Sequence, residues 1–234
     1  MRSTIAVALV FACQHAQKAY ADTSEVAASI MLGSDRVWRG LSQTRGNPGI
    51  EGEAKWNHAD GPVAGLVVAD YRSDQTGKSG AAITPFVAFN KDIAGFNIDA
   101  GYLYRGVTGA RNRDFSEVTI SAGHYFGKLR TRLGIFYSWH HYLPGQNTYT
   151  YFDTRMPLAE VAGLPLAVTG HLGVFDARGN ADDYVDWRVG LTTKVHGVSL
   201  SANLSHADVD AERSRLEGAR HGGTRFAGTA FLLF

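Results

Sequence analysis

Two side chains near the middle of the chain have types and a spacing that could support nucleophilic catalysis. Ser138 and His140 are two positions apart in an alternating stretch, so both lie on one face of a predicted strand. A serine activated by a histidine needs a third group to orient the histidine. No third partner is evident, and the sequence has no G-x-S-x-G segment. We therefore predict that the protein has no catalytic residue and is not an enzyme, with lipid modification by this pair as an alternative.

Metal-binding patterns are also weak. His140 and His141 are adjacent, and adjacent side chains of a strand point to opposite faces, so they would not chelate an ion together. The segment Asp208–Glu212 (DVDAE) has alternate carboxylates that could hold calcium in a loop, but solvated loops have the same pattern. We predict no metal and no cofactor.

The first residues have the features of a secretory signal peptide. A positively charged start precedes the apolar run Thr4–Ala12, and Ala19–Ala21 offers small residues at both positions that a signal peptidase reads. We expect residues 1–21 to be removed by cleavage before Asp22. Residues 22–234 would then form a single domain.

The composition of the mature chain excludes several classes of protein. Cleavage removes Arg2 and Lys18 from the 23 basic residues, which leaves 21 against 22 acidic residues and a net charge of −1. The only cysteine, Cys13, is also removed, so disulfides and thiolate chemistry are excluded. A nucleic-acid partner needs a basic face, and this chain has no excess of basic residues.

Beyond the leader, apolar and polar residues alternate one by one. In Val198–Ser205 (VSLSANLS), for example, valine, leucine and alanine alternate with serine and asparagine. Strict period two is typical of β-strands with one polar and one apolar face. About twelve such segments are present, over residues 24–33, 48–58, 62–71, 82–91, 94–106, 115–126, 128–140, 148–156, 164–175, 184–196, 198–206 and 224–234.

The connectors between these segments alternate between short and long. Short ones such as VHG alternate with long polar ones such as RSDQTGKSG. This is typical of an outer-membrane barrel with short periplasmic turns and longer external loops, in which closure gives every backbone polar group a partner. We predict an all-β, transmembrane, antiparallel up-and-down β-barrel. The alternative is a soluble sandwich or lipocalin-like barrel, whose apolar face would lie inside.

Aromatic residues support the membrane interpretation. The chain ends in FAGTAFLLF, and a terminal aromatic residue such as Phe234 is the signal that the outer-membrane assembly machinery recognises. Aromatic side chains near strand ends on the apolar face predict girdles at the two membrane interfaces. These residues are Trp56, Tyr71, Phe89, Tyr102, Tyr104, Phe126, Tyr137, Trp139, Tyr149, Trp187 and Phe234.

The polar face of the predicted strands would line the lumen, and it carries both acids and bases. In one interpretation these charges line a narrow aqueous path and set its selectivity. In the other they pair across the lumen and plug it, because a barrel of intermediate size can be filled or open. The candidate lining residues are Arg39, Glu51, Glu53, Lys55, Asp99, Arg105, Glu117, Arg130, Arg132 and Arg188.

The segment Ser34–Trp56 (SDRVWRGLSQTRGNPGIEGEAKW) resembles the start of the TorF-like porin family of proteobacteria. Members of that family typically carry S-D-aromatic-x-aromatic-R-G-[IL]-S-Q-T followed by N-P-x-[IL]-Q-G, just after a signal peptide. The resemblance implies an outer-membrane barrel of about this length and covers nearly the whole mature chain. This sequence departs from the pattern at Arg36, Arg45 and Glu51, which makes the mouth more charged and puts a shared selectivity in doubt.

The alternation also predicts a contact within this segment. It makes Leu41–Asn47 an external loop and places Arg39 on the same inward face as Glu51 and Glu53. An arginine–glutamate bridge across the first hairpin is therefore the leading hypothesis for the shape of the barrel mouth.

Together these observations predict a passive, selective channel for small hydrophilic solutes in the outer membrane of a Gram-negative bacterium. The expected partners are membrane lipid, the assembly machinery and the solutes. A non-conducting barrel with a structural or adhesive role is the main alternative.

Overall fold

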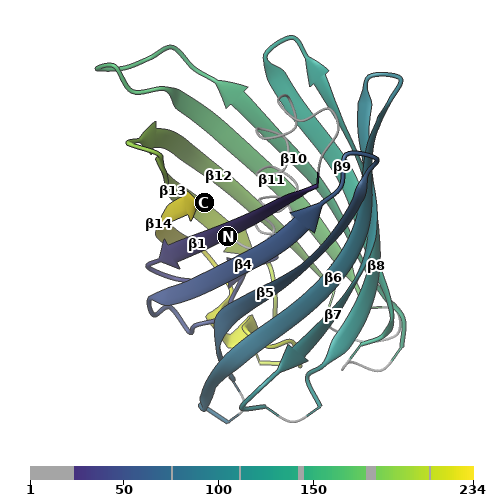
Figure 1. Ribbon diagram of the computed structural model, residues 1–234. Coiled ribbons are helices and arrows are strands. Elements are labelled where there is room, and N and C mark those ends of the chain that lie inside the picture. The colour runs from purple at the N-terminus through teal and green to yellow at the C-terminus, as the bar shows by residue number, and fades with distance from the viewer. Residues whose placement is uncertain (1–23, 75, 111, 142–144, 178–182, 211) are drawn as a thin grey trace.

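The computed structural model describes residues 24–74, 76–110, 112–141, 145–177, 183–210 and 212–234. Twelve antiparallel strands form a closed barrel in which each strand pairs with its neighbour in the chain, and β1 closes the sheet on β14 (Figure 1). The barrel strands are β1 Glu25–Gly33, β4 Gly49–Asn57, β5 Pro62–Arg72, β6 Ser79–Ile93, β7 Phe96–Val107, β8 Phe115–Phe126, β9 Leu129–His140, β10 Asn147–Pro157, β11 Leu166–Asp176, β12 Tyr184–Val195, β13 Val198–Ala207 and β14 Arg225–Leu233. The predicted all-β up-and-down barrel and its twelve segments are confirmed.

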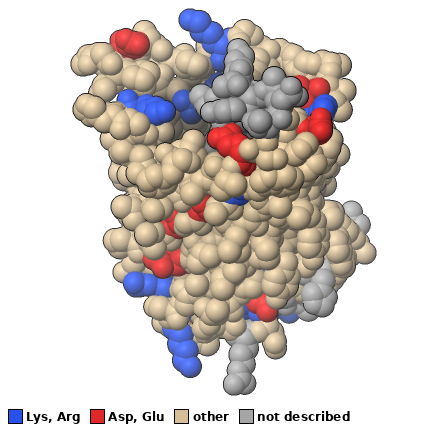
Figure 2. All heavy atoms as spheres, in the orientation of Figure 1, with Lys and Arg blue, Asp and Glu red and all other residues tan. Residues whose placement is uncertain are grey.

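The barrel is apolar outside and polar inside. In β12, Val185, Val189 and Leu191 are 41%, 54% and 52% exposed on the outer face, whereas Asp186 and Arg188 are buried inside. Most of the wall seen in Figure 2 carries uncharged residues, and lysine and arginine side chains project mainly at its two ends. A soluble barrel would have the opposite arrangement, so that alternative is wrong.

The connectors separate by length between the two ends of the barrel, with one exception. One end, here called the short-turn end, has the connectors 58–61, 94–95, 127–128 and 196–197 and the longer segment 158–165. Ala94–Gly95 and His196–Gly197 have positive φ at both residues, which is the backbone of the two-residue hairpin turns that match strand twist. The other end, the long-loop end, has the segments 34–48, 73–78, 108–114, 141–146, 177–183 and 208–224.

The segment 34–48 does not form the predicted external loop. It folds into the barrel as an inward hairpin of two short strands, β2 Val37–Trp38 and β3 Leu41–Ser42. Arg39 and Gly40 form its turn with φ of 49° and 75°. The prediction failed because alternation identifies where strands end but carries no information about the direction in which a loop folds.

The C-terminal long loop also turns inward and packs on the hairpin. It contains the single turn of 3-10 helix η1 Ala219–His221, at the lower end of the barrel in Figure 1. Among the described residues, no helix is long and apolar enough to cross a membrane. A buried apolar cluster joins wall, hairpin and loop, and it consists of Leu41, Phe136, Tyr149, Tyr151, Phe175, Ala177, Tyr184, Ala207, Leu216 and Ala219.

Two aromatic residues of the predicted girdles lie on the opposite face from the one expected. Tyr71 and Tyr149 are only 2% and 1% exposed because their strands direct them into the lumen, where they pack under the hairpin. Other residues of the predicted girdles have rings exposed on the outer face as expected, and these include Trp56, Phe89, Tyr102, Tyr104, Phe126, Trp139 and Phe234.

Candidate functional site

The inward hairpin crosses the lumen and is fixed to the opposite wall by Arg39. Its guanidinium donates to both carboxylate oxygens of Glu117 on β8, at 2.8 and 2.7 Å. β8 lies on the far side of the barrel from β1 and β4, which flank the hairpin. Burial lowers the pKa of Arg39, but the opposing effect of the Glu117 carboxylate and two nearby tyrosines is larger, so the pKa is raised and Arg39 stays charged. The predicted bridge from Arg39 to Glu51 or Glu53 is wrong.

Aromatic rings surround the same guanidinium. The carbon at its centre lies 4.5 Å from the ring centroid of Trp38, 4.6 Å from that of Phe136 and 4.5 Å from that of Tyr149. These cation–π contacts strengthen in a desolvated site, and they leave the guanidinium little freedom to rotate. Arg39 and Glu117 therefore form a fixed connection across the lumen between the hairpin and β8, which we call the partition.

Glu51 has a different partner from the one predicted. Arg36, at the base of the hairpin, donates to Glu51 at 3.0 Å and also to the backbone oxygen of Asp70. Burial lowers the pKa of Arg36 to about 10, although Glu51 opposes the shift, so Arg36 stays charged near neutral pH. Arg36 and Glu51 are two of the three departures from the porin motif, and they compensate for each other as a buried pair.

Asp35 ties the hairpin to its own base and to β14. One carboxylate oxygen accepts hydrogen bonds from Ser42 at 2.6 Å and Thr44 at 2.9 Å, and the other accepts from Arg225 at 2.7 Å. The motif residues Asp35, Ser42 and Thr44 thus act together, and their role is to hold the hairpin closed on itself inside the barrel.

The C-terminal loop is attached to the mouth by a second set of contacts. Glu217 pairs with Arg113 at 3.2 Å and accepts a hydrogen bond from the backbone N–H of Asp74 at 2.8 Å. The carboxylate of Asp74 accepts from the backbone N–H of Gly218, also at 2.8 Å. The hairpin and this loop together narrow the long-loop end of the barrel.

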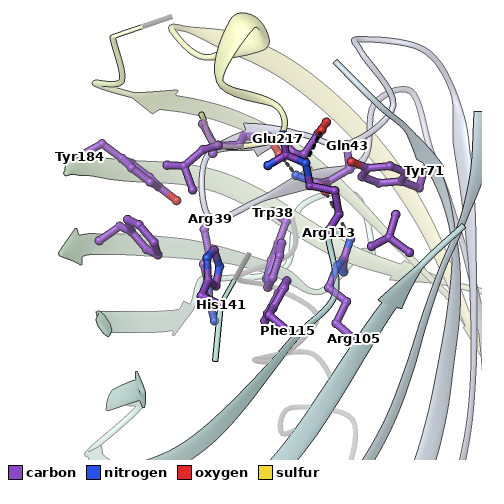
Figure 3. Close-up of a pocket in the computed structure, with 14 residues that line it drawn as sticks. Trp38, Arg39, Gln43, Tyr71, Arg105, Arg113, Phe115, His141, Tyr184 and Glu217 are labelled. Atoms are coloured by element: carbon purple, nitrogen blue, oxygen red, sulfur yellow. Dashed lines mark hydrogen bonds and ion pairs between the residues drawn. The ribbon is translucent and has the colours of Figure 1, made fainter. Parts of the chain in front are cut away.

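A pocket of about 440 Å³, partly open to solvent, remains between hairpin, loop and wall. Its charged lining consists of Arg39, Arg105, Arg113 and Glu217, which approach it from different elements (Figure 3). Arg105 lies 4.4 Å from the ring centroid of Trp38, and it donates to the side-chain oxygen of Gln43 at 3.3 Å. Of the three guanidiniums, Arg39 and Arg113 are paired with Glu117 and Glu217, and Arg105 adds a positive charge beyond these two pairs.

His141 lies partly buried beside these arginines. Burial, together with the charges of Arg39 and Arg113, lowers its pKa to about 3. The imidazole is therefore neutral at physiological pH. It packs on Phe115, with ring centroids 4.8 Å apart, so it extends the aromatic side of the pocket.

A row of directly opposed polar residues continues around the wall. Across β9 to β14 the register aligns Arg132, Asp153, His171, Arg188, Ser205 and Arg225. His171 lies between two carboxylates, at 2.7 Å from Asp153 and 3.2 Å from Asp186. Asp153 within the row and Asp186 beside it supply the carboxylates that pair with His171, which lowers the free-energy cost of burying these charges.

The structure places all ten predicted lining residues on the inner face, in two groups. One group lies at the constriction and consists of Arg39, Glu51, Arg105 and Glu117. The other lies deeper and consists of Glu53, Lys55, Asp99, Arg130, Arg132 and Arg188. Lys55 pairs with Glu53 at 3.4 Å, whereas Arg132 donates to Ser121 at 2.6 Å.

Sequence reasoning missed Arg36, Trp38, Gln43, Arg113, His141 and Glu217, because residues in loops have no period that assigns them a face.

Ser138, the serine of the alternative lipid-modifying pair, makes a local contact. Ser138 is buried, and its hydroxyl donates to the backbone oxygen of Ser116 at 2.6 Å. The side chain of His140 lies outside the described part of the structure. Within the described part, no group of three histidine, cysteine, aspartate or glutamate side chains could hold a metal ion.

The end of the chain closes the barrel. The backbone N–H of Phe234 donates to the oxygen of Ala28 at 2.8 Å, beside the β1–β14 pairing. Its ring is exposed on the outer face. The predicted signal peptide, residues 1–21, falls outside the described residues.

Several solved structures share this fold, and two porins and an outer membrane channel are among them. A KdgM porin matches with a TM-score of 0.55 and 9% identity, over 91% of this chain and 99% of that one. A NanC porin matches with a TM-score of 0.52 and 10% identity, over 88% and 98%. An outer membrane channel, COG4313, from Pseudomonas putida F1 matches with a TM-score of 0.51 and 13% identity, over 92% and 95%. At such low identity these likenesses show the fold alone.

Comparison at the level of sequence identifies the family. A search of curated proteins found no match. The resemblance to the TorF-like porins, drawn from the opening motif, is not confirmed by these comparisons. A model of the bacterial proteins of unknown function called Gcw_chp matches residues 17–233, and the chain therefore belongs to the Gcw_chp family.

Proposed function

We propose that this protein is an outer-membrane β-barrel that forms a passive, selective channel for small hydrophilic solutes. The observation that carries the proposal is the distribution of residues on one closed sheet, with an apolar outer face and buried charges inside. A lipid bilayer favours such an apolar exterior. The charged interior provides hydrophilic solutes with a path across the membrane that the lipid itself does not provide. The porin-like fold supports the same function.

In this proposal the short-turn end faces the periplasm and the long-loop end faces the exterior, as in other bacterial barrels. The signal peptide would direct the chain across the inner membrane, and the strand ending in Phe234 would be recognised by the assembly machinery. No nucleic acid and no cofactor take part.

The constriction would set selectivity. Any solute that enters from the long-loop end passes Arg105, whose charge is additional to the Arg39–Glu117 and Arg113–Glu217 pairs, before it reaches the deeper lumen. Fixed charges in a narrow, low-dielectric passage act strongly on passing ions. We therefore propose that the passage favours anions.

A non-conducting barrel is the second candidate, and the hairpin favours it. Buried pairs such as Arg39–Glu117 and Arg36–Glu51 could close the lumen as easily as they shape it. The two candidates differ in whether the protein conducts ions in a bilayer.

Planar-bilayer recording of the purified protein in potassium chloride separates them. The channel function predicts discrete current steps, and a sample unfolded by heat is the control for contaminants. Protein that floats with liposomes, and is therefore inserted, but that gives no steps would identify a non-conducting barrel.

A further inference from the structure

A second cavity lies inside the barrel, directly deeper than the partition formed by Arg39 and Glu117. It has about 720 Å³ of space, part of it open to solvent. Phe136 lines it and also contacts the guanidinium of Arg39, 4.6 Å from the ring centroid. On β8, Thr119 lines this cavity and is the next inward position after Glu117. We call this cavity the lumen chamber.

The lining of the lumen chamber is apolar, although it belongs to the face that is charged elsewhere. Inward positions of five strands supply Val63, Val67, Phe86, Leu103, Phe136 and Tyr151. Polar side chains are few and include Lys55, Asn90 and Asp99. An apolar cavity with a few polar groups is the composition of a small-molecule site rather than of a water-filled passage.

Positive charge flanks the lumen chamber on two sides. At the mouth, the pocket beside the hairpin contains Arg105, together with Arg39 and Arg113 in their pairs with Glu117 and Glu217. Toward the short-turn end, Arg130 on β9 lies directly opposite Arg155 on β10. These two guanidiniums, at directly opposed positions, add positive charge at that end of the lumen.

We propose that the lumen chamber binds the apolar ring or short chain of a small amphipathic carboxylate, whose anionic group is attracted by the flanking arginines. Phe136 and Tyr151, with ring centroids 5.7 Å apart, offer aromatic faces to the apolar part. The inference rests on the proposed channel function, because it names the class of solute that the channel carries. It predicts that a ring and a negative charge act together in recognition.

Three probes of matched structure test this inference in single-channel recordings. Phenylacetate has both ring and negative charge, acetate has the charge without the ring, and benzylammonium has the ring with the opposite charge. We expect phenylacetate to interrupt the current at concentrations about tenfold lower than either of the others. Equal effects of phenylacetate and acetate would overturn the role of the chamber, and equal effects of phenylacetate and benzylammonium would overturn the role of the arginines.

Paired substitutions test whether phenylacetate blocks the current from inside the lumen chamber. Val67→Thr adds a hydroxyl inside the chamber, and Val68→Thr makes the same change on the outer face, where Val68 is 42% exposed. The first should weaken block by phenylacetate about fivefold, and the second should leave it unchanged. Ala88→Leu fills the chamber and should weaken block as well. Block that survives both Val67→Thr and Ala88→Leu, in variants that still give current steps, would contradict the proposal.

The recordings also separate this inference from the proposed function. Wild-type protein that gives current steps in potassium chloride but no preferential block by phenylacetate would overturn the inference alone. Absence of steps in the wild type would overturn the channel function, and the inference with it.

Discussion

Arg39 and Glu117 form a bidentate ion pair across the lumen although 78 positions separate them in the chain. Arg39 occupies the turn of the inward hairpin, and Glu117 lies on the wall at β8. The pair converts a loop that could extend into solvent into a partition inside the barrel. Its removal should therefore change both stability and the width of the passage.

Arg39→Gln should release the hairpin from the wall. Because Glu117 would be left buried without its partner, we expect the free energy of unfolding to fall by about 3–5 kcal/mol and the single-channel conductance to rise. Arg45→Gln, at an exposed position of the same segment, is the control and should change neither. The double change Arg39→Gln/Glu117→Gln should recover part of the stability, because no unpaired charge remains. An unchanged conductance in Arg39→Gln would show that the hairpin does not limit the passage.

Gly40→Ala should displace the hairpin turn through steric contact alone. An added Cβ would lie 2.5 Å from the Cβ of Asp186 and 2.8 Å from that of Ala207. Gly46→Ala is a matched control, because Gly46 has a similar positive φ but no atom within 4 Å of the added Cβ. Both substitutions carry the backbone penalty of about 1 kcal/mol, so any larger loss of thermal stability in Gly40→Ala measures the contact. Equal losses in the two variants would argue against close packing of the turn on the wall.

His141 should make the protein less stable in acid. Its pKa in the folded state is about 3, compared with 6.5 for the ordinary side chain. Between these values the unfolded chain binds a proton that the folded protein does not, so stability rises with pH by about 1.4 kcal/mol per unit and is lost as pH falls. Urea unfolding from pH 7 to pH 4 should show a weaker pH dependence in His141→Gln than in the wild type. Parallel curves would show that the imidazole protonates without hindrance in the folded state.

Arg105→Gln should reduce the preference for anions. Arg105 lies at the pocket between hairpin and wall, so loss of its charge lowers the positive potential where the passage is narrow. We expect the ratio of chloride to potassium permeability, from reversal potentials in a salt gradient, to fall about twofold. Arg72→Gln is the control, because Arg72 follows the inward Tyr71 and points to the outside of the wall. The same fall in both variants would place the selectivity outside the lumen.

The barrel could be predicted from the sequence because apolar and polar residues alternate along every strand. Segments such as Val198–Ser205 identify both the strand and its two faces, and turn residues such as Gly95 and Gly197 mark the ends. The alternation also assigned Glu117 and Arg132 to the interior correctly. It failed for Tyr71 and Tyr149, because an aromatic residue near a strand end fits either a membrane interface or a buried cluster.

The site could be predicted only in part, since pairing across a barrel depends on loop conformation. Arg39 was placed in the lumen, but its partner lies on a distant strand rather than on the neighbouring one. Arg36 and Glu51 were noted as departures from a motif, but their pairing with each other was not predicted. The lumen chamber was not foreseen, because inward apolar residues such as Val67 and Leu103 interrupt the expected polar face without altering the period.

The central claim is that the inward hairpin sets the width of a conducting path through the barrel. The most direct test replaces residues 37–42 with a glycine–serine linker of equal length and compares its single-channel conductance with that of the wild type. The linker lacks Trp38 and Arg39, so it cannot form the partition. The account predicts current steps in both proteins, with larger steps in the linker variant. Steps of equal size, or none in either protein, would contradict it.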